Sequence, residues 1–169
     1  MIVEAHGLRV ELPPRWTGRV FRRRGGNATL HAGDFPLVLG DGEFGDGSTA
    51  RMPPGATFVV VTEYVPGGGL EPGRGLFAAG AIELPLEPRA FSSRCLAHPR
   101  RDQAGSQQFF TRAGRPLCLY VVLAGARSHR RRQLPVLNRV LRSLSVQPLG
   151  HAARGASQPP AGGAAGAPV

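Results

Sequence analysis

Two cysteines and five histidines are the side chains of this 169-residue chain best suited to nucleophilic or metal chemistry. Cys95 could act as a nucleophile with His98, but its sequence neighbours offer only Arg94 and His98 to lower its pKa. Cys118 falls in an apolar run, which predicts a buried thiol. The histidines form no pair four residues apart, and the sequence contains no Gly-x-Ser-x-Gly elbow. We therefore expect a protein that is not an enzyme, with no catalytic residue, no metal and no cofactor.

A glycine-rich segment at residues 40–47 matches the dinucleotide-binding pattern and carries three carboxylates. That pattern needs a helix whose N-terminus faces the pyrophosphate, and the pair Pro53-Pro54 interrupts the chain soon afterwards. Asp41, Glu43 and Asp46 depart from the spacing of an EF-hand loop, which needs more ligands and a bidentate glutamate at its end. We expect a solvated acidic loop without a nucleotide or calcium site.

Arginine supplies all of the basic excess, because Lys and Arg total 21 and no lysine occurs. Codon bias in a GC-rich genome would favour Arg, Ala, Gly and Pro together. The net charge of +10 nevertheless favours acidic partners. The candidate contact residues for a partner or a polyanion are Arg22, Arg23, Arg24, Arg130, Arg131 and Arg132. The sequence leaves open whether they meet an acidic protein or the phosphates of a nucleic acid.

Aromatic side chains that could stack on nucleic-acid bases fall in predicted strands. They are Phe58, Tyr64, Phe109, Phe110 and Tyr120. Because single-stranded nucleic acid is usually held by exposed aromatic side chains, we expect a protein partner first and weak nucleic-acid binding second. An enzyme of unrecognised type would need His31, Asp34, Glu63 and His98 to converge, and the sequence does not place them together.

Hydrophobic periodicity predicts the elements that position these residues. Strands are expected at residues 8–12, 16–21, 29–32, 58–64, 107–111 and 117–123. The first three would form an antiparallel meander, the last two a hairpin, and the strands at 58–64 and 117–123 are apolar on both faces, as in central strands. The apolar spacing after residue 134 predicts a helix that starts near Leu134, because Pro135 fits only in a first turn. These elements predict an α+β fold: a mostly antiparallel sheet with a C-terminal helix packed on one face.

The chain divides into residues 1–147, which have the length of a single α+β domain, and residues 148–169. This second segment is rich in Pro, Gly and Ala and lacks an apolar anchor, so we expect a disordered tail. The glycine-rich stretch at 66–75 is expected to be a loop. No signal-peptide pattern and no run of 18 apolar residues occurs, so we expect a cytoplasmic protein that does not contact a membrane.

The order of the expected elements resembles the PsbP-like fold. The resemblance runs from Leu12-Pro13-Pro14-Arg15-Trp16, at the end of an early strand, to the helix ending Val140-Leu141-Arg142-Ser143-Leu144. It implies an αβα sandwich and a non-catalytic adaptor that binds partner proteins. Our expectation is therefore a protein-interaction or adaptor module that binds an acidic partner. The alternative is a nonspecific nucleic-acid or polyanion binder.

Overall fold

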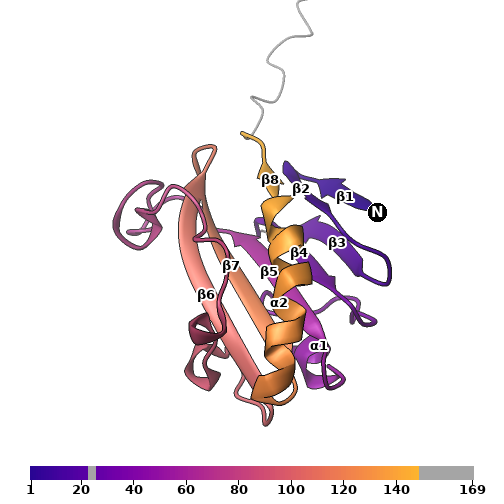
Figure 1. Cartoon of the computed structure of the whole chain (residues 1–169). Coiled ribbons are helices and arrows are strands. Elements are labelled where there is room, and N and C mark those ends of the chain that lie inside the picture. The colour runs from indigo at the N-terminus through magenta and orange to yellow at the C-terminus, as the bar shows by residue number, and fades with distance from the viewer. Residues whose placement is uncertain (23–25, 149–169) are drawn as a thin grey trace, which may run out of the picture.

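A computed structural model describes residues 1–22 and 26–148 of the chain (Figure 1). Arg23 and Arg24 therefore lie outside the described residues, as does all of the expected tail except Pro148. The described residues form two antiparallel sheets and one long helix, which confirms the predicted α+β fold.

A five-stranded antiparallel sheet lies at the centre of the fold, with the strand order β3-β4-β5-β7-β6. Its strands are β3 (Thr17–Arg22), β4 (Ala28–Gly33), β5 (Thr57–Glu63), β6 (Gln103–Arg112) and β7 (Arg115–Ala124). Both β5 and β7 are internal and buried along their whole lengths, as their apolar runs predict. The predicted β6–β7 hairpin is confirmed, and it turns at Ala113 and Gly114, which both have positive φ.

A smaller sheet contains β1 (Ile2–Ala5), β2 (Leu8–Glu11) and β8 (Ser145–Val146) in the order β1-β2-β8. The expected meander is therefore wrong in one respect, because β2 pairs with β1 and β8 and does not pair with β3. The physical reason is a turn from Pro13 to Trp16, in which Arg15 has a φ of 71° and the chain passes from one sheet to the other. Sequence analysis missed β1.

Helix α2 (Arg127–Arg142) packs on one face of the central sheet, as expected. In Figure 1 it crosses in front of the sheet and ends beside β8. The predicted start near Leu134 is wrong, because the helix begins at Arg127 and contains Pro135 in its interior. Proline removes the N–H that would bond to the Arg131 carbonyl. Both residues are exposed, so water can satisfy that carbonyl.

The segment between β4 and β5 covers the other face of the sheet. It contains the short helix α1 (Asp46–Ala50), so the glycine-rich loop ends earlier than expected. Phe35 from this segment is buried against Phe58, and Phe44 packs against Tyr120. A second, apolar cluster therefore lies on the face opposite α2.

A long connection at residues 64–102 joins β5 to β6 and contains only three short 3₁₀ helices. These are η1 (Gly75–Phe77), η2 (Pro88–Ala90) and η3 (Ser93–Cys95). The stretch at 66–75 has no regular structure before η1, as predicted for a loop. Neither α1 nor α2 is long and apolar enough to cross a membrane, and these are the α-helices of the described chain.

Candidate functional sites

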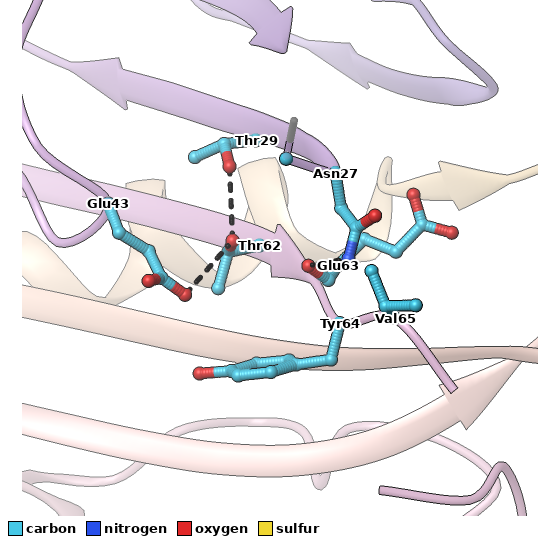
Figure 2. Close-up of a pocket in the computed structure, with 8 residues that line it drawn as sticks. Asn27, Thr29, Glu43, Thr62, Glu63, Tyr64 and Val65 are labelled. Carbon is cyan, nitrogen blue, oxygen red and sulfur yellow. Dashed lines mark hydrogen bonds between the residues drawn. The ribbon is translucent and has the colours of Figure 1, made fainter. Parts of the chain in front are cut away.

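A polar pocket lies where β4 and β5 meet, with a volume of about 230 Å³ (Figure 2). The hydroxyls of Thr29 and Thr62 are 3.0 Å apart and hydrogen-bonded. Thr62 also donates to the Glu43 carboxylate at 3.4 Å. The Tyr64 ring lies below these side chains in Figure 2. Asn27 closes the far end of the pocket through a hydrogen bond from its amide to the Glu63 carbonyl at 2.9 Å.

Burial shifts the pKa values of three titratable side chains on this face of the sheet in the direction that favours their neutral forms. Burial raises the pKa of the Cys118 thiol to about 11. Burial, reinforced by the nearby Cys118 and Glu43, raises the pKa of Tyr64, and burial lowers the pKa of His31. An activated nucleophile needs the opposite shift. The polar side chains that line the pocket are therefore better suited to join β4, β5 and the 40–47 loop by hydrogen bonds than to act as nucleophiles.

The four polar residues that an enzyme would need to bring together are His31, Asp34, Glu63 and His98. The structure separates them. Asp34 accepts a hydrogen bond from the Thr57 N–H, at the first residue of β5, whereas Glu63 is the last residue of that strand. The two ends of β5 are about 20 Å apart. His31 is completely buried and His98 is exposed on the long connection.

Asp41 has a structural role that sequence analysis missed. One carboxylate oxygen accepts hydrogen bonds from the N–H groups of Gly42 and Gly47, and the other accepts from the N–H of Ser48 at 2.7 Å. Partial burial alone would raise the pKa of Asp41, but these bonds and one from the Ser48 side chain together lower it. The carboxylate thus fixes the loop at the start of α1. The described residues contain no group of three side chains able to hold a metal ion.

The described members of the two predicted arginine clusters lie at opposite ends of the central sheet. Arg22 ends β3 and pairs with Ala28, at the end of the sheet where β5 finishes. Arg130 lies in α2 near Gln133, whose amide donates to the carbonyl of Ala56 just before β5 begins. Arg22 therefore does not share a surface with Arg130, Arg131 and Arg132.

The solvent side of α2 carries a row of arginines, which we call the arginine face. It consists of Arg127, Arg131, Arg132, Arg139 and Arg142, which are all exposed. The helix contains no Asp or Glu, and within residues 1–22 and 26–148 none of these five arginines forms an ion pair. Two of the predicted contact residues, Arg131 and Arg132, belong to this face. Arg127, Arg139 and Arg142 were not among the candidates, and the candidate Arg130 is half-buried and lies outside this face.

Five arginines elsewhere in the structure are matched by carboxylates, whereas others, such as Arg51, Arg74 and Arg112, form no ion pair with a described residue. Ion pairs join Arg9 to Glu4, Arg89 to Glu87, Arg100 to Asp46, Arg101 to Asp102 and Arg115 to Glu63. What sets α2 apart is that several arginines lie together on one helix that contains no Asp or Glu. An acidic surface approaching α2 would meet no repelling carboxylate on the helix.

Comparison with known proteins returns no match, whether the chain is set against protein-family models, curated proteins or solved structures. Its function therefore has to be argued from its own residues.

Proposed function

We propose that this chain is a non-catalytic interaction module that binds an acidic partner protein through the arginine face of α2. The observation that carries the proposal is five exposed arginines on a helix without a carboxylate. Charge complementarity of this kind steers association and selects against basic partners. The resemblance to the PsbP-like fold implies the same class of function.

The N-terminal half of α2 contains features that destabilise an isolated helix. No side chain caps its N-terminus at Ala126, and Arg127, Arg130 and Arg131 lie in its first turns. Positive charge near a helix N-terminus is unfavourable, by about 0.3 to 1 kcal/mol for each residue, because it opposes the helix dipole. Departures from local rules concentrate at functional sites. The basic N-terminal half of α2 is therefore more easily explained by binding than by folding.

A protein partner accounts for this surface better than a nucleic acid does. The large apolar side chains exposed among the described residues are Met1, Ile2, Leu39, Val65, Leu76 and Val136, and none is aromatic. Bases of a single strand would therefore find no fully exposed ring among the described residues, and the rings of Tyr64 and Phe109 are half-buried. Val136 lies on α2 among the arginines and offers an apolar contact that a protein can use and a phosphate cannot. Phosphate binding by the same arginines is the alternative outcome of the test below.

The test compares two triple variants of the full chain that lose the same charge. One carries Arg131→Gln, Arg132→Gln and Arg139→Gln. The control carries Arg51→Gln, Arg74→Gln and Arg94→Gln, which are exposed and lie outside α2. Each tagged protein is used to recover partners from its lysate at low and moderate salt, with and without nuclease treatment.

We expect wild type and the control to recover one protein in stoichiometric amount at both salt concentrations, and the α2 variant to recover little. Recovery that is heterogeneous, sensitive to nuclease and lost at moderate salt would contradict the proposal and favour the polyanion alternative. Equal recovery by the two triple variants would show that the arginine face is not the binding surface. Circular dichroism of each variant checks that its fold is retained.

The proposal places the module in the cytoplasm. Cys95 is exposed and Cys118 buried, and both are free thiols, as suits a reducing compartment. Cell fractionation with an antibody against the tag tests this location, and recovery only in the membrane pellet or the secreted fraction would contradict it.

A further inference from the structure

An apolar groove lies beside the C-terminal end of α2. Figure 1 shows that the helix ends beside β8. The volume of the groove is about 230 Å³. The apolar side chains that line it come from three parts of the chain and include Ile82, Leu84, Phe110, Leu141, Leu144 and Val146. Phe110 and Leu141 are buried in the core, whereas Ile82, Leu84, Leu144 and Val146 are only partly covered. The groove is thus an opening onto the main core.

Two arginines complete the lining of this groove. Arg112 ends β6, and Arg142 is the last residue of α2. Both are exposed, and neither forms an ion pair with another described residue. Because Arg142 also belongs to the arginine face, the groove and that face form one continuous surface. The groove adds an apolar pocket to a surface that otherwise offers charge.

We infer that this groove binds a linear acidic segment of the partner, with one large apolar side chain in the groove and neighbouring carboxylates on Arg112 and Arg142. Buried anchors of this kind supply much of the affinity of protein interfaces, whereas exposed charge pairs supply orientation. The inference rests on the proposed function and specifies the partner further. The partner segment needs an apolar side chain to fill the groove and carboxylates to pair with the two arginines.

Two other occupants of the groove, the C-terminal residues 149–169 and a second copy of the chain, match its charge less well than an acidic partner. Residues 149–169 contain no Asp or Glu, so they would leave both arginines without a counter-charge. A second copy would bring another arginine face and another net charge of +10 toward the first. Like charges at an interface disfavour such a complex. An acidic partner is the occupant that matches both the apolar lining and the charge.

The test uses a fluorescein-labelled peptide with a central phenylalanine between glutamates, titrated with the full chain and followed by fluorescence anisotropy. Two control peptides replace the phenylalanine by serine or the glutamates by glutamines. Ala81→Phe fills the groove from an exposed position in its lining, and Ala79→Phe adds the same ring on the same segment outside the lining. A third variant carries Arg112→Gln and Arg142→Gln. Thermal melting of each variant confirms that it is folded.

We expect wild type and Ala79→Phe to bind the peptide equally well. The serine peptide and the Ala81→Phe variant should each weaken binding about tenfold or more, because a large apolar side chain is no longer buried. The glutamine peptide and the double arginine variant should weaken it about three- to tenfold, as for partly exposed ion pairs.

Equal binding of the phenylalanine and serine peptides, with no effect of Ala81→Phe, would overturn the inference that the groove binds an apolar side chain of the partner. If Arg131→Gln, Arg132→Gln and Arg139→Gln then abolish binding, the arginine face is retained as the site and the proposed function stands without the anchor. If the acidic peptide does not bind at all, the inference about the groove is also overturned. The proposed function is then tested by the lysate experiment alone. A wild-type dimer in sedimentation that Ala81→Phe abolishes would assign the groove to a second copy and overturn the acidic partner.

Discussion

Arg115 joins segments of the chain that are far apart in sequence, and its removal offers the sharpest test of how the fold is held together. Its side chain is 1% exposed and donates to both oxygens of the Glu63 carboxylate at 2.8 Å. It also donates to the carbonyls of His6, Gly7 and Gln147 at 3.0 to 3.1 Å. All five N–H groups of the guanidinium are therefore used. One side chain links the β1–β2 turn and the end of β8 to the central sheet.

The variant Arg115→Met removes these bonds and leaves the Glu63 carboxylate buried without a partner. Breaking a buried ion pair in this way costs about 3 to 5 kcal/mol. Small domains have free energies of unfolding of about 5 to 15 kcal/mol, so the variant should lose a large share of its stability. Adding Glu63→Leu removes the unpaired charge. The double variant should therefore be more stable than Arg115→Met by about 1 to 3 kcal/mol and less stable than wild type, since three carbonyls have lost the guanidinium donor.

Urea unfolding followed by far-ultraviolet circular dichroism measures these free energies for the wild type, both single variants and the double variant. Amide hydrogen exchange supplies a local measurement, because the Gln147 N–H bonds to the Gly7 carbonyl and should exchange faster once Arg115 is gone. A loss below about 1 kcal/mol in Arg115→Met would refute the reasoning. A double variant less stable than Arg115→Met would show that the Glu63 charge is not the source of the penalty.

Three further predictions concern single side chains. Burial lowers the pKa of His31 below its ordinary 6.5, so the unfolded chain binds a proton that the folded chain excludes, and the free energy of unfolding should fall from about pH 7 to pH 5. Urea unfolding measured at several pH values should show that the free energy of unfolding depends less on pH in His31→Gln than in wild type. An unchanged pH dependence would contradict this prediction. Asn138→Ala leaves the N–H and C=O of Leu86 unpaired and should cost about 2 to 3 kcal/mol in the same assay, whereas a cost below about 0.5 kcal/mol would show that water replaces the amide. Pro135→Ala restores the N–H that bonds to the Arg131 carbonyl and should raise the melting temperature, with a stabilisation of about 1 to 3 kcal/mol, so a lower melting temperature would contradict the account of α2.

The parts of the fold that could be predicted are those whose local pattern has a single physical explanation. The run Thr57–Glu63 is apolar and β-branched on both faces, and only an internal strand buries both faces of such a run. The Arg112–Arg115 connection has Gly at a position that requires positive φ. In both cases the sequence within the element was sufficient.

The predictions of the helix start and of the first strand failed because local sequence rules do not include the surroundings of a residue in the folded chain. Pro135 obeys the rule that proline removes a helix hydrogen bond, and the helix can continue because Arg131, whose carbonyl loses that bond, is an exposed residue that water can reach. Strand β1 consists of residues that are exposed or only half-buried, so its alternation was too weak to identify. The turn at His6 and Gly7, with both φ values positive, was the signal that could have found it.

The candidate sites divide in the same way. Had α2 been started at Arg127, its spacing alone would have brought Arg131, Arg139 and Arg142 onto one face. The groove had no such signal, because its lining comes from segments around residues 82, 110 and 144 that meet only in the folded chain. Codon bias can account for the number of arginines in this protein, but it does not explain why several of them lie together on a helix that contains no carboxylate. It is this distribution, more than the net charge, that favours recognition of an acidic partner.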